Sequence, residues 1–336
     1  MSLNVMKFSL IVPVYNRPDE IADLLESLDH QTDRGFELVL VEDGSTVPCR
    51  EIVDRYASHF DIQYFAKGNE GRSIARNYGM DHAKGDYFVF VDSDCILPPD
   101  YFESLRKKMS TDYADCFGGP DSAHESFTDT QKAINFAMTA FLTTGGIRGG
   151  KVQMEKFVPR TFNMGFSREV WEKVGGFREM FSEDIDMSTR IRQAGYSPQL
   201  FREVIVFHKR RGNLHKFWRQ VHIFGMSRIT LQLLYPGSMK LVHWMPAMFT
   251  IGSMLLLILG ILLSPLWLIP LGIYLLALWI SAIISTKSLK IGSMAVAASL
   301  VQLLGYGTGF IRAYVWKILL RHGRDETQEV ALRKGK

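Results

Sequence analysis

The sequence predicts an α/β domain followed by helices that are apolar enough to enter a membrane. Over about the first two hundred residues, short apolar runs alternate with segments of helical period, a pattern typical of a sheet covered by helices. Residues 241–285 then contain no Asp, Glu, Lys or Arg, and a second uncharged run covers residues 291–311. At about 1.5 Å per residue, the first run is long enough to cross a hydrocarbon layer of about 30 Å twice. A buried core helix could be this apolar, but a doubled run of such length favours a membrane anchor.

Each predicted strand is a short apolar run that ends in polar residues, and each predicted helix carries apolar residues on one face. The strands are expected at residues 8–14, 36–41, 62–65, 87–91, 162–166 and 204–207. The helices are expected around residues 21–28 and at 71–83, 168–174 and 183–195. In an open parallel sheet the ligand crevice lies at the carboxyl ends of the strands, so the polar residues there are the first candidates for a site.

We divide the chain into four parts on these grounds. The α/β domain covers residues 1–212, an amphipathic region that suits the membrane interface covers 213–240, a transmembrane anchor covers 241–320, and a polar tail covers 321–336. The anchor contains three apolar segments, at about 241–263, 266–285 and 291–311. The turn between the first two is expected at Ser264-Pro265.

A third apolar segment would make the number of membrane crossings odd, which affects the side on which the C-terminal tail lies. The first two segments form a hairpin that returns Lys287 and Lys290 to the starting side, in agreement with the positive-inside rule. If the third segment also crosses, the basic tail lies on the opposite side, against that rule. Gly305, Gly307 and Gly309 permit a broken or re-entrant path, and we expect this segment to be irregular or interfacial.

Charge and cysteine usage limit the partners and the compartment. A net charge of +4 is too small to indicate nucleic acid as a partner. Basic side chains cluster just before the apolar runs, where the headgroups of anionic membrane lipids would lie. They are Lys209, Arg210, Arg211, Lys216, Arg219, Arg228 and Lys240.

The start of the chain lacks the long apolar core of a secretory signal. Cys49, Cys95 and Cys116 are scattered without metal-ligand spacing and fit a reducing compartment. We therefore expect a multi-pass protein of the inner (plasma) membrane with its α/β domain in the cytoplasm.

The sharpest chemical signal is Asp92-Ser93-Asp94, directly after the apolar run 87–91. In an extended chain, residues two apart point to the same side, so both carboxylates can face one site. Two carboxylates leave several positions of a Mg²⁺ or Mn²⁺ shell open for diphosphate oxygens and water. The alternative is that the acids only solvate a strand end, but their place after a buried strand favours the metal site.

Three other polar residues permit two interpretations each. Asp43 ends the second strand, where it could accept the imide N–H of a uracil ring or serve only as the first residue of an Asp-Gly turn. Arg72 and Arg76 lie four residues apart on one helix face, where they could contact a base or diphosphate or be surface charges. The spacing alone does not separate these possibilities.

Two further candidates lie later in the chain. Glu183 and Asp184 begin a predicted helix, whose dipole favours the ionised carboxylate that a general base must have. By spacing alone, ordinary helix capping with Ser182 as the cap is the better explanation. His208 ends the last predicted strand, where an imidazole could complete a metal shell, although a single histidine is more often structural.

Together these residues resemble the inverting family 2 glycosyltransferases of the GT-A fold, a Rossmann-like fold that binds nucleotide-diphosphate sugars. The resemblance covers about residues 9–227 and rests on blocks that occur in the family's order. The blocks are SLIVPVYN (9–16), VLVEDGS (39–45), NEGRSIARNYG (69–79), DSD (92–94), NMGF (163–166), VGGF (174–177), ED (183–184) and residues 190–195. Each block alone is a weak signal, and their common order carries the resemblance.

The resemblance implies roles for the individual residues. The implied donor-binding residues are Pro13, Tyr15, Asn16, Asp43, Arg72, Arg76, Asp92 and Ser93. The implied ligands of Mg²⁺ or Mn²⁺ are Asp94 as the main ligand, Asp92 and His208. Asp184 would be the catalytic base, with Asn163 and Glu183 near the acceptor.

One departure from the family affects the expected product. Processive members carry a Gln-x-x-Arg-Trp motif after the base, whereas residues 199–203 read QLFRE, without the Trp. Two or three membrane segments are also too few for a polymer channel. We therefore expect transfer of a single sugar from a nucleotide-diphosphate sugar to a lipid-linked saccharide in surface polysaccharide synthesis. The resemblance implies UDP as the nucleotide and leaves guanosine and thymidine nucleotides open. Two alternatives stay open: glycosylation of polyprenyl phosphate itself, and a degenerate fold that serves as a non-catalytic membrane scaffold.

Overall fold

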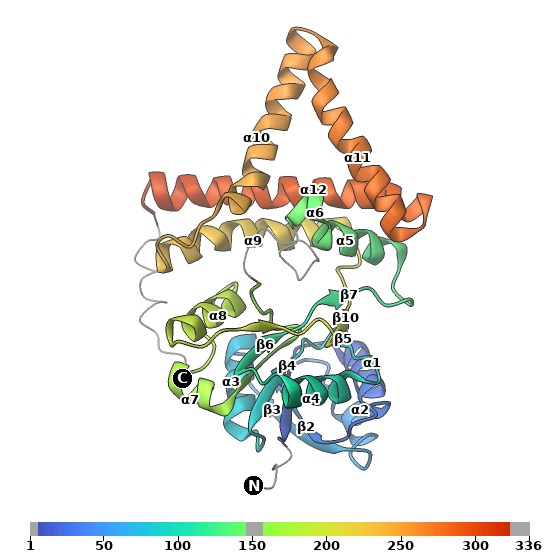
Figure 1. Cartoon of the computed structure of the whole chain (residues 1–336), viewed down its shortest axis with the longest axis vertical. Helices are drawn as coiled ribbons and strands as arrows, with labels where there is room; N and C mark the ends of the chain where they lie inside the picture. The colour runs from blue at the N-terminus through green and yellow to red at the C-terminus, as the bar shows by residue number, and fades with distance from the viewer. Residues whose placement is uncertain (1–5, 146–156, 323–336) are drawn as a thin grey trace. The chain divides into compact units, whose positions relative to one another are not determined.

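The structure is a computed structural model that describes residues 6–145 and 157–322 (Figure 1). Within these residues the chain forms two compact units, one of residues 6–124 and 157–209 and the other of residues 125–145 and 210–322. Residues 125–145 thus group with the C-terminal helices, although they interrupt the α/β region in the sequence. Nearly all of the predicted polar tail lies outside the described residues.

The first unit is built on a seven-stranded mixed sheet with the strand order β3-β2-β1-β4-β8-β6-β9. These strands are β1 (Phe8–Val14), β2 (Phe36–Asp43), β3 (Asp61–Lys67), β4 (Tyr87–Phe90), β6 (Cys116–Gly118), β8 (Met164–Ser167) and β9 (Gln199–Leu200). Strands β1 to β4 are parallel, and β8 runs antiparallel to both β4 and β6. A smaller sheet has the order β5-β10-β7, with β5 (Cys95–Ile96), β10 (Val206–His208) and β7 (Asp121–Ser122).

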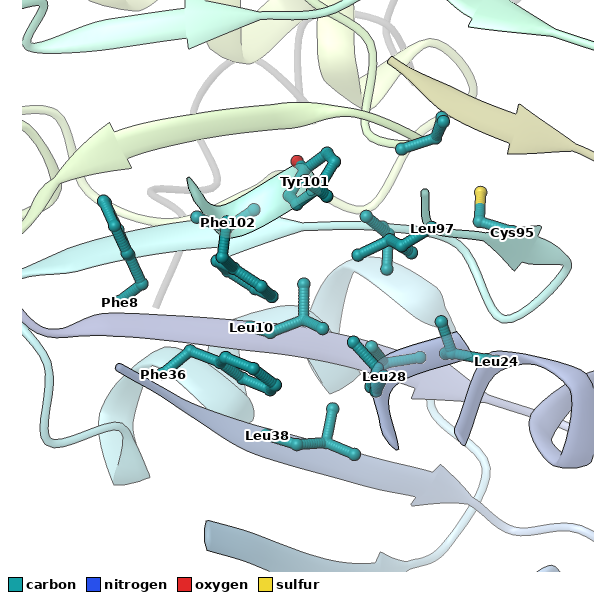
Figure 2. Packing of buried hydrophobic residues seen from close by; sticks show 14 of the residues in the cluster. Phe8, Leu10, Leu24, Leu28, Phe36, Leu38, Cys95, Leu97, Tyr101 and Phe102 are labelled. Carbon is teal, nitrogen blue, oxygen red and sulfur yellow. The ribbon is translucent and has the colours of Figure 1, made fainter. Parts of the chain in front are cut away.

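Helices supply the partners for both faces of the main sheet. They are α1 (Pro18–Asp29), α2 (Arg50–Asp54), α3 (Arg72–His82), α4 (Tyr101–Thr111), α7 (Arg168–Val174) and α8 (Glu183–Gln193). Because side chains alternate along a strand, Leu10 of β1 belongs to one apolar cluster and its neighbour Ile11 belongs to another. In the first cluster Leu24 and Leu28 of α1 pack near Leu10 (Figure 2). This two-sided burial explains why β1 reads as a continuous apolar run.

The strand order places a topological switch point between β1 and β4. Connections lead from β1 to β2 and β3 on one side, while β4 pairs with the other side of β1. The pairing of β1 with β4 ends at Ile11 and Phe90, and Pro13, which has no N–H to donate, lies beyond it. In open α/β sheets ligands bind outside the carboxyl ends of the strands at such a point.

The second unit is helical. Its elements are α5 (Asp129–Thr139), α6 (Phe141–Thr144), α9 (Leu214–Leu234), α10 (Leu241–Leu262), η1 (Pro265–Leu268), α11 (Ile269–Thr286), α12 (Leu289–Ala313) and the π-helix η2 (Tyr314–Leu319). Three helical stretches, Leu241–Leu262, Pro265–Thr286 and Leu289–Leu319, are long and apolar enough to cross a membrane. They coincide with the three predicted apolar segments. The third is not irregular: it is a continuous α-helix as far as Ala313.

Candidate active site

The end of β4 and the end of β10 bring a carboxylate and an imidazole together. Asp94 follows β4, and His208 closes β10, where it pairs with Cys95 of β5. The Asp94 Oδ1 and His208 Nε2 atoms are 3.2 Å apart. The ligand atoms of Asp94, Cys95 and His208 all lie within 4.8 Å of one another. A carboxylate beside an imidazole is a donor set that fits a divalent cation such as Mn²⁺.

Cys95 is the least suitable member of this group. Burial, together with the nearby carboxylates of Asp94 and Asp92, raises the pKa of its thiol well above the usual value. Its Sγ atom lies 3.6 Å from the carbonyl oxygen of Phe162. Because a thiol binds metals as the thiolate, Asp94 and His208 are the better candidates for metal ligands in this group.

Asp121 is a neighbour of this site that the sequence does not indicate. Its Oδ2 atom lies 3.5 Å from His208 Nδ1, and its side chain is fully buried. A carboxylate on the second ring nitrogen fixes the orientation of a metal-binding histidine. Asp121 stands in β7, which has two residues and pairs with β10 at Val206, so only the long-range pairing reveals it.

Asp92 takes a different partner from Asp94. Its Oδ1 atom lies 2.6 Å from Arg76 Nη2, and Arg76 Nη1 lies 3.0 Å from Glu183 Oε1. Arg72 completes this row of charges, with its Nε atom 2.7 Å from the same Glu183 oxygen. Of the three predicted metal ligands, the structure brings Asp94 and His208 together and turns Asp92 towards Arg76.

This row of ion pairs joins the end of β4 to the starts of α3 and α8. Arg76 is only 1% exposed and Glu183 only 2%. Burial lowers the pKa of Arg72, but the charge of Glu183 and its hydrogen bond outweigh this and raise it overall. In the described residues Arg76 holds the two sides of the site together, and its contact with the donor stays a prediction.

We expect Arg76→Met to destabilise the first unit strongly. Removing one member of a buried ion pair leaves the other charge without compensation and costs about 3–5 kcal/mol. For a unit of this size the loss corresponds to a fall in melting temperature of about 10 °C. Thermal unfolding of the purified full chain would measure it, with the exposed Arg55→Met as the matched control. If the melting temperature of Arg76→Met falls no further than that of Arg55→Met, the ion pairs of Arg76 do not stabilise the first unit.

Three acids lie in the first turn of α8, and each has different surroundings. Glu183 and Asp186 are 2% and 0% exposed, and each is held by two arginines. The side chain of Asp184 is 16% exposed, and its nearest cation is Arg160, with Nη1 3.6 Å from Asp184 Oδ1. Among these three carboxylates, Asp184 is the one with room to contact another molecule.

Ordinary capping does not explain this helix start. Ser182 adopts a left-handed conformation with φ 64°, and in the described structure its side chain makes no capping hydrogen bond to α8. A left-handed residue other than glycine costs of order 1–3 kcal/mol and persists where the surroundings enforce it. The conformation sets the direction in which Glu183 and Asp184 leave the loop.

The residues predicted for the nucleoside lie where β1 and β2 end. Asn16 has φ 51°, and its Oδ1 atom accepts hydrogen bonds from the backbone N–H groups of Thr46 and Val47 at 2.8 and 3.1 Å. Asn16 therefore fixes the loop after β2 against the end of β1. Pro13 is buried in β1, whereas Tyr15 is 51% exposed and presents its ring to solvent.

Asp43 organises the approach to α3. Its Oδ1 atom accepts from Lys67 Nζ at 3.1 Å and from Glu70 N at 3.0 Å, and its Oδ2 atom accepts from Gly71 N at 2.8 Å. Burial lowers the pKa of Lys67, but the carboxylates of Glu70 and Asp43 raise it overall, so the lysine carries its charge. A carboxylate has about four acceptor positions, so these three bonds leave one for a ligand.

Two residues that are predicted to contact substrates are buried in the described structure. Asn163, predicted near the acceptor, is 0% exposed; it accepts from the Tyr101 hydroxyl at 2.8 Å and donates to the Val204 carbonyl at 2.7 Å. In the described structure internal partners hold this amide group, and its role near the acceptor stays a prediction. Ser93, predicted to contact the donor, is 8% exposed between the two acids.

Two basic residues contact Asp94, and only the first of them, Arg17, is absent from the prediction. Arg17, which follows the first motif, has its Nη1 atom 3.5 Å from Asp94 Oδ2. Lys209 donates its backbone N–H to the Asp94 carbonyl at 2.9 Å, and its side chain pairs with Asp23. Arg17 directly follows the motif residue Asn16, which is the signal that could have found it, whereas Lys209 belongs to the predicted basic cluster.

Comparison with known proteins adds a family to this geometry. Residues 9–175 match the family model described as Glycosyl transferase family 2. The uncharacterized glycosyltransferase YibD of Escherichia coli (strain K12) is 31% identical over 172 residues, which are 50% of this chain and 46% of that protein. The minor teichoic acid biosynthesis protein GgaB of Bacillus subtilis (strain 168) is 38% identical over 105 residues, 29% of this chain and 11% of that protein. The chain thus spans less than half the length of either relative.

A solved structure supports the fold over nearly the whole chain. The mannosyltransferase PcManGT from Pyrobaculum calidifontis, in complex with GDP-Man and Mn²⁺, has a TM-score of 0.58 and 16% sequence identity. The match covers 94% of this chain and 89% of that one. At this identity the likeness shows the fold, and it confirms the predicted Rossmann-like GT-A class with helices after it.

Proposed function

Because this chain belongs to glycosyl transferase family 2, a family that transfers sugars from activated donors, we propose that it is a metal-dependent, inverting transferase of a single sugar. The observation that carries the proposal is the Asp92–Arg76–Glu183 row of ion pairs, in which Arg76 and Glu183 are buried. Asp94 lies two residues after Asp92, and Asp184 follows Glu183. These ion pairs therefore keep the segment of the candidate metal ligand Asp94 close to the segment of the candidate base Asp184.

The proposed reaction needs one proton transfer and one displacement. Asp184 accepts the proton of an acceptor hydroxyl, and the freed oxygen forms a bond to the anomeric carbon of the donor sugar. The bond from that carbon to the diphosphate breaks on the opposite face, so the configuration inverts and a nucleoside diphosphate leaves. Arg17, with its Nη1 atom 3.5 Å from Asp94 Oδ2, is placed to compensate the charge of the departing diphosphate.

The donor set favours Mn²⁺ over Mg²⁺. Asp94 supplies an oxygen and His208 a nitrogen, whereas Mg²⁺ takes oxygen ligands almost exclusively. When bound, a divalent cation supplies charge neutralisation to the diphosphate. Asp121 orients His208 for this role through the second ring nitrogen.

We propose UDP as the nucleotide of the donor. Asp43 keeps one acceptor position beside its three internal hydrogen bonds, and this position suits the imide N–H of uracil. The exposed ring of Tyr15 can stack on the base. Fixing of the loop after β2 by Asn16 holds these groups in place before the donor arrives.

We further propose a lipid-linked saccharide as the acceptor, at the cytoplasmic face of a plasma membrane. The three apolar helices favour a membrane-bound acceptor, because an anchored enzyme meets lipid-linked substrates at the surface. The free, buried cysteines agree with a reducing compartment. GgaB, as a relative named for teichoic acid biosynthesis, supports a role in surface polymers.

Donor binding by the full chain tests this function directly. In a thermal-shift screen of UDP-, GDP- and TDP-sugars with Mn²⁺, a UDP-sugar at 100 times its dissociation constant should add about 2.7 kcal/mol of stability. The Asp43→Asn variant, which keeps the shape but loses the accepting charge, should bind the UDP donor less tightly. Stabilisation by a GDP- or TDP-sugar alone would overturn the nucleotide assignment. If no nucleotide sugar stabilises the chain, the scaffold alternative would take its place.

A further inference from the structure

The second unit separates its charges from its largest apolar surface. Among residues 210–322 every charged side chain is Lys or Arg, and none is Asp or Glu. None of these cations lies between Leu241 and Thr286, the stretch that forms α10, η1 and α11. Only 17% and 11% of the apolar windows in these two helical stretches are buried, compared with 50% for the stretch that contains α12. The two kinds of surface therefore suit two depths of one membrane.

Helices α5 and α9, which carry charged side chains, pack against α12. At its start, Lys290 Nζ lies 2.7 Å from Asp129 Oδ2 of α5. Further along, a Cβ atom added to Gly309 would overlap the His222 carbonyl of α9. Just after α12, Lys317 donates to the Thr230 hydroxyl at 3.0 Å. Figure 1 shows α12 lying along α9 in this way.

This packing determines the depth of α12. Lys216 and Arg219 of α9 are exposed and charged, so α9 cannot lie in hydrocarbon. A helix that packs side by side with α9 and α5 must share their depth. Although α12 is long and apolar enough to span, its neighbours place it at the membrane surface.

The hairpin of α10 and α11 stands on α12 with its two legs apart. Gly292 of α12 packs against Ile283 of α11, and Gly307 packs against Pro246 of α10. These two glycines are about 22 Å apart along the helix at 1.5 Å per residue. At the other end the legs meet, where a Cβ added to Gly260 would lie 2.8 Å from a methyl group of Leu268.

The splayed legs limit how deep the hairpin reaches. Each leg is about 22–27 Å long from its contact with α12 to the turn, at the usual rise per residue. With a base of about 22 Å, a triangle of these sides is about 20 Å high. The hydrocarbon core of a bilayer is about 30 Å thick, so the turn ends inside it.

The composition of the turn agrees with this depth. Its side chains are apolar and exposed, with Ile261 at 81%, Leu262 at 73% and Leu266 at 69%. A loop that emerged into water on the far side would present this surface to solvent. Hydrocarbon is the surrounding that these side chains fit.

The backbone of the turn is also prepared for hydrocarbon, where each unpaired polar group is costly. The N–H groups of Leu263 and Ser264 both donate to the Leu259 carbonyl at 2.9 and 3.2 Å. Leu266 N donates to the Ser264 hydroxyl at 3.4 Å, and Trp267 N donates to the Ser264 carbonyl at 3.1 Å. The intervening Pro265 has no N–H group.

We propose that the second unit binds a bilayer from one side only. Helices α10 and α11 enter the hydrocarbon as a re-entrant hairpin whose turn stays within it. Helices α5, α9 and α12 lie at the interface, where the cations of α9 and α12 face anionic headgroups. The chain after α12 then lies on the same side of the membrane as the first unit. This arrangement agrees with the positive-inside rule, which a crossing third segment would violate. The proposal replaces the membrane-crossing hairpin expected from the sequence and does not depend on the proposed function.

Single reporter cysteines test this arrangement in the full chain. The native cysteines are buried, so the unmodified chain is the background control. The reporters are Thr111→Cys on the first unit, Ser264→Cys at the turn and His322→Cys after η2. Each variant is reconstituted into sealed vesicles that contain phosphatidylglycerol, and a membrane-impermeant maleimide is placed either outside or inside the vesicles. Leu266→Cys serves as a second turn reporter should the loss of the Ser264 hydroxyl prevent folding.

The re-entrant arrangement predicts that Thr111→Cys and His322→Cys react from the same side and to the same extent. The turn reporter should react from neither side, at a rate at least tenfold below its rate in detergent. A turn reporter that reacts from the side opposite Thr111→Cys would show a hairpin that crosses. Reaction of His322→Cys from the opposite side would show that α12 crosses. Either result overturns the proposal.

Discussion

Replacing Asp184 by asparagine is expected to lower turnover at least a hundredfold while leaving donor affinity nearly unchanged. An acceptor hydroxyl is a poor nucleophile at neutral pH, and positioned proton removal contributes typically about 10²–10⁴-fold. Asparagine keeps the shape of the side chain but cannot accept the proton. Because Asp184 is partly exposed and its nearest cation, Arg160, is 3.6 Å away, the substitution leaves the buried ion pairs in place. Single-turnover kinetics beside a donor-binding isotherm would separate the two effects.

The neighbouring acids provide matched controls. Glu183→Gln removes the charge that Arg72 and Arg76 surround, so we expect it to lower stability as well as activity. A folded Glu183→Gln variant that is inactive, beside an Asp184→Asn variant with normal turnover, would reverse the two roles. Normal turnover of Asp184→Asn with a phosphate acceptor would instead favour polyprenyl phosphate as the acceptor, because a phosphate oxygen needs no strong base.

The sequence predicts those elements whose signal is local. Long apolar runs with turn residues after them place β1, β2, β3 and β4 within a few residues of their observed bounds. Helices α3 and α7 agree with the expected ranges to within one residue at each end. Strands of two or three residues, such as β5, β6 and β7, carry too few side chains to show a period.

The metal side of the site depends on those short strands. Asp94 and His208 are more than a hundred residues apart, and the pairing of β10 with β5 brings them together. The pairing of β10 with β7 then adds Asp121. No local pattern encodes these pairings, so the sequence could indicate the ligand types but not the carboxylate behind the histidine.

The sequence does not show which of the predicted site residues are buried. Asn163 and Arg76 fit the motif as polar residues near a ligand, yet both side chains are enclosed by internal partners. The sequence offers a charge or an amide group but not its neighbours, which come from other elements.

Helix α5 shows a different limit. Its start carries a capping box, in which Thr128 and Gln131 each bond the backbone of the other, and this pattern is visible in the sequence. Its packing against α12 joins residues far apart in the chain and has no such signal.

Removal of the metal is expected to abolish tight donor binding. Asp94 would repel a diphosphate in the absence of a divalent cation, because like charges at short range oppose binding. Chelation with EDTA should therefore remove the stabilisation by a nucleotide sugar, and Asp94→Ala should reproduce this loss with Mn²⁺ present. Asp112→Asn, which alters an exposed acid at the end of α4, is the matched control and should bind the donor normally. Donor affinity that is unchanged in EDTA would remove the metal from the mechanism.

Replacing Asp121 is expected to weaken metal binding only in part. Asp121 faces the Nδ1 atom of His208, whereas Asp94 faces the Nε2 atom, so Asp121→Asn should weaken Mn²⁺ binding about 10–100-fold without abolishing it, as expected for a residue that orients a ligand. Titration of Mn²⁺ followed by electron paramagnetic resonance measures this directly, without turnover. An Asp94→Ala variant should show no saturable binding in the same range. If Asp121→Asn binds Mn²⁺ as tightly as the unmodified chain while Asp94→Ala does not, Asp121 does not orient the histidine for metal binding.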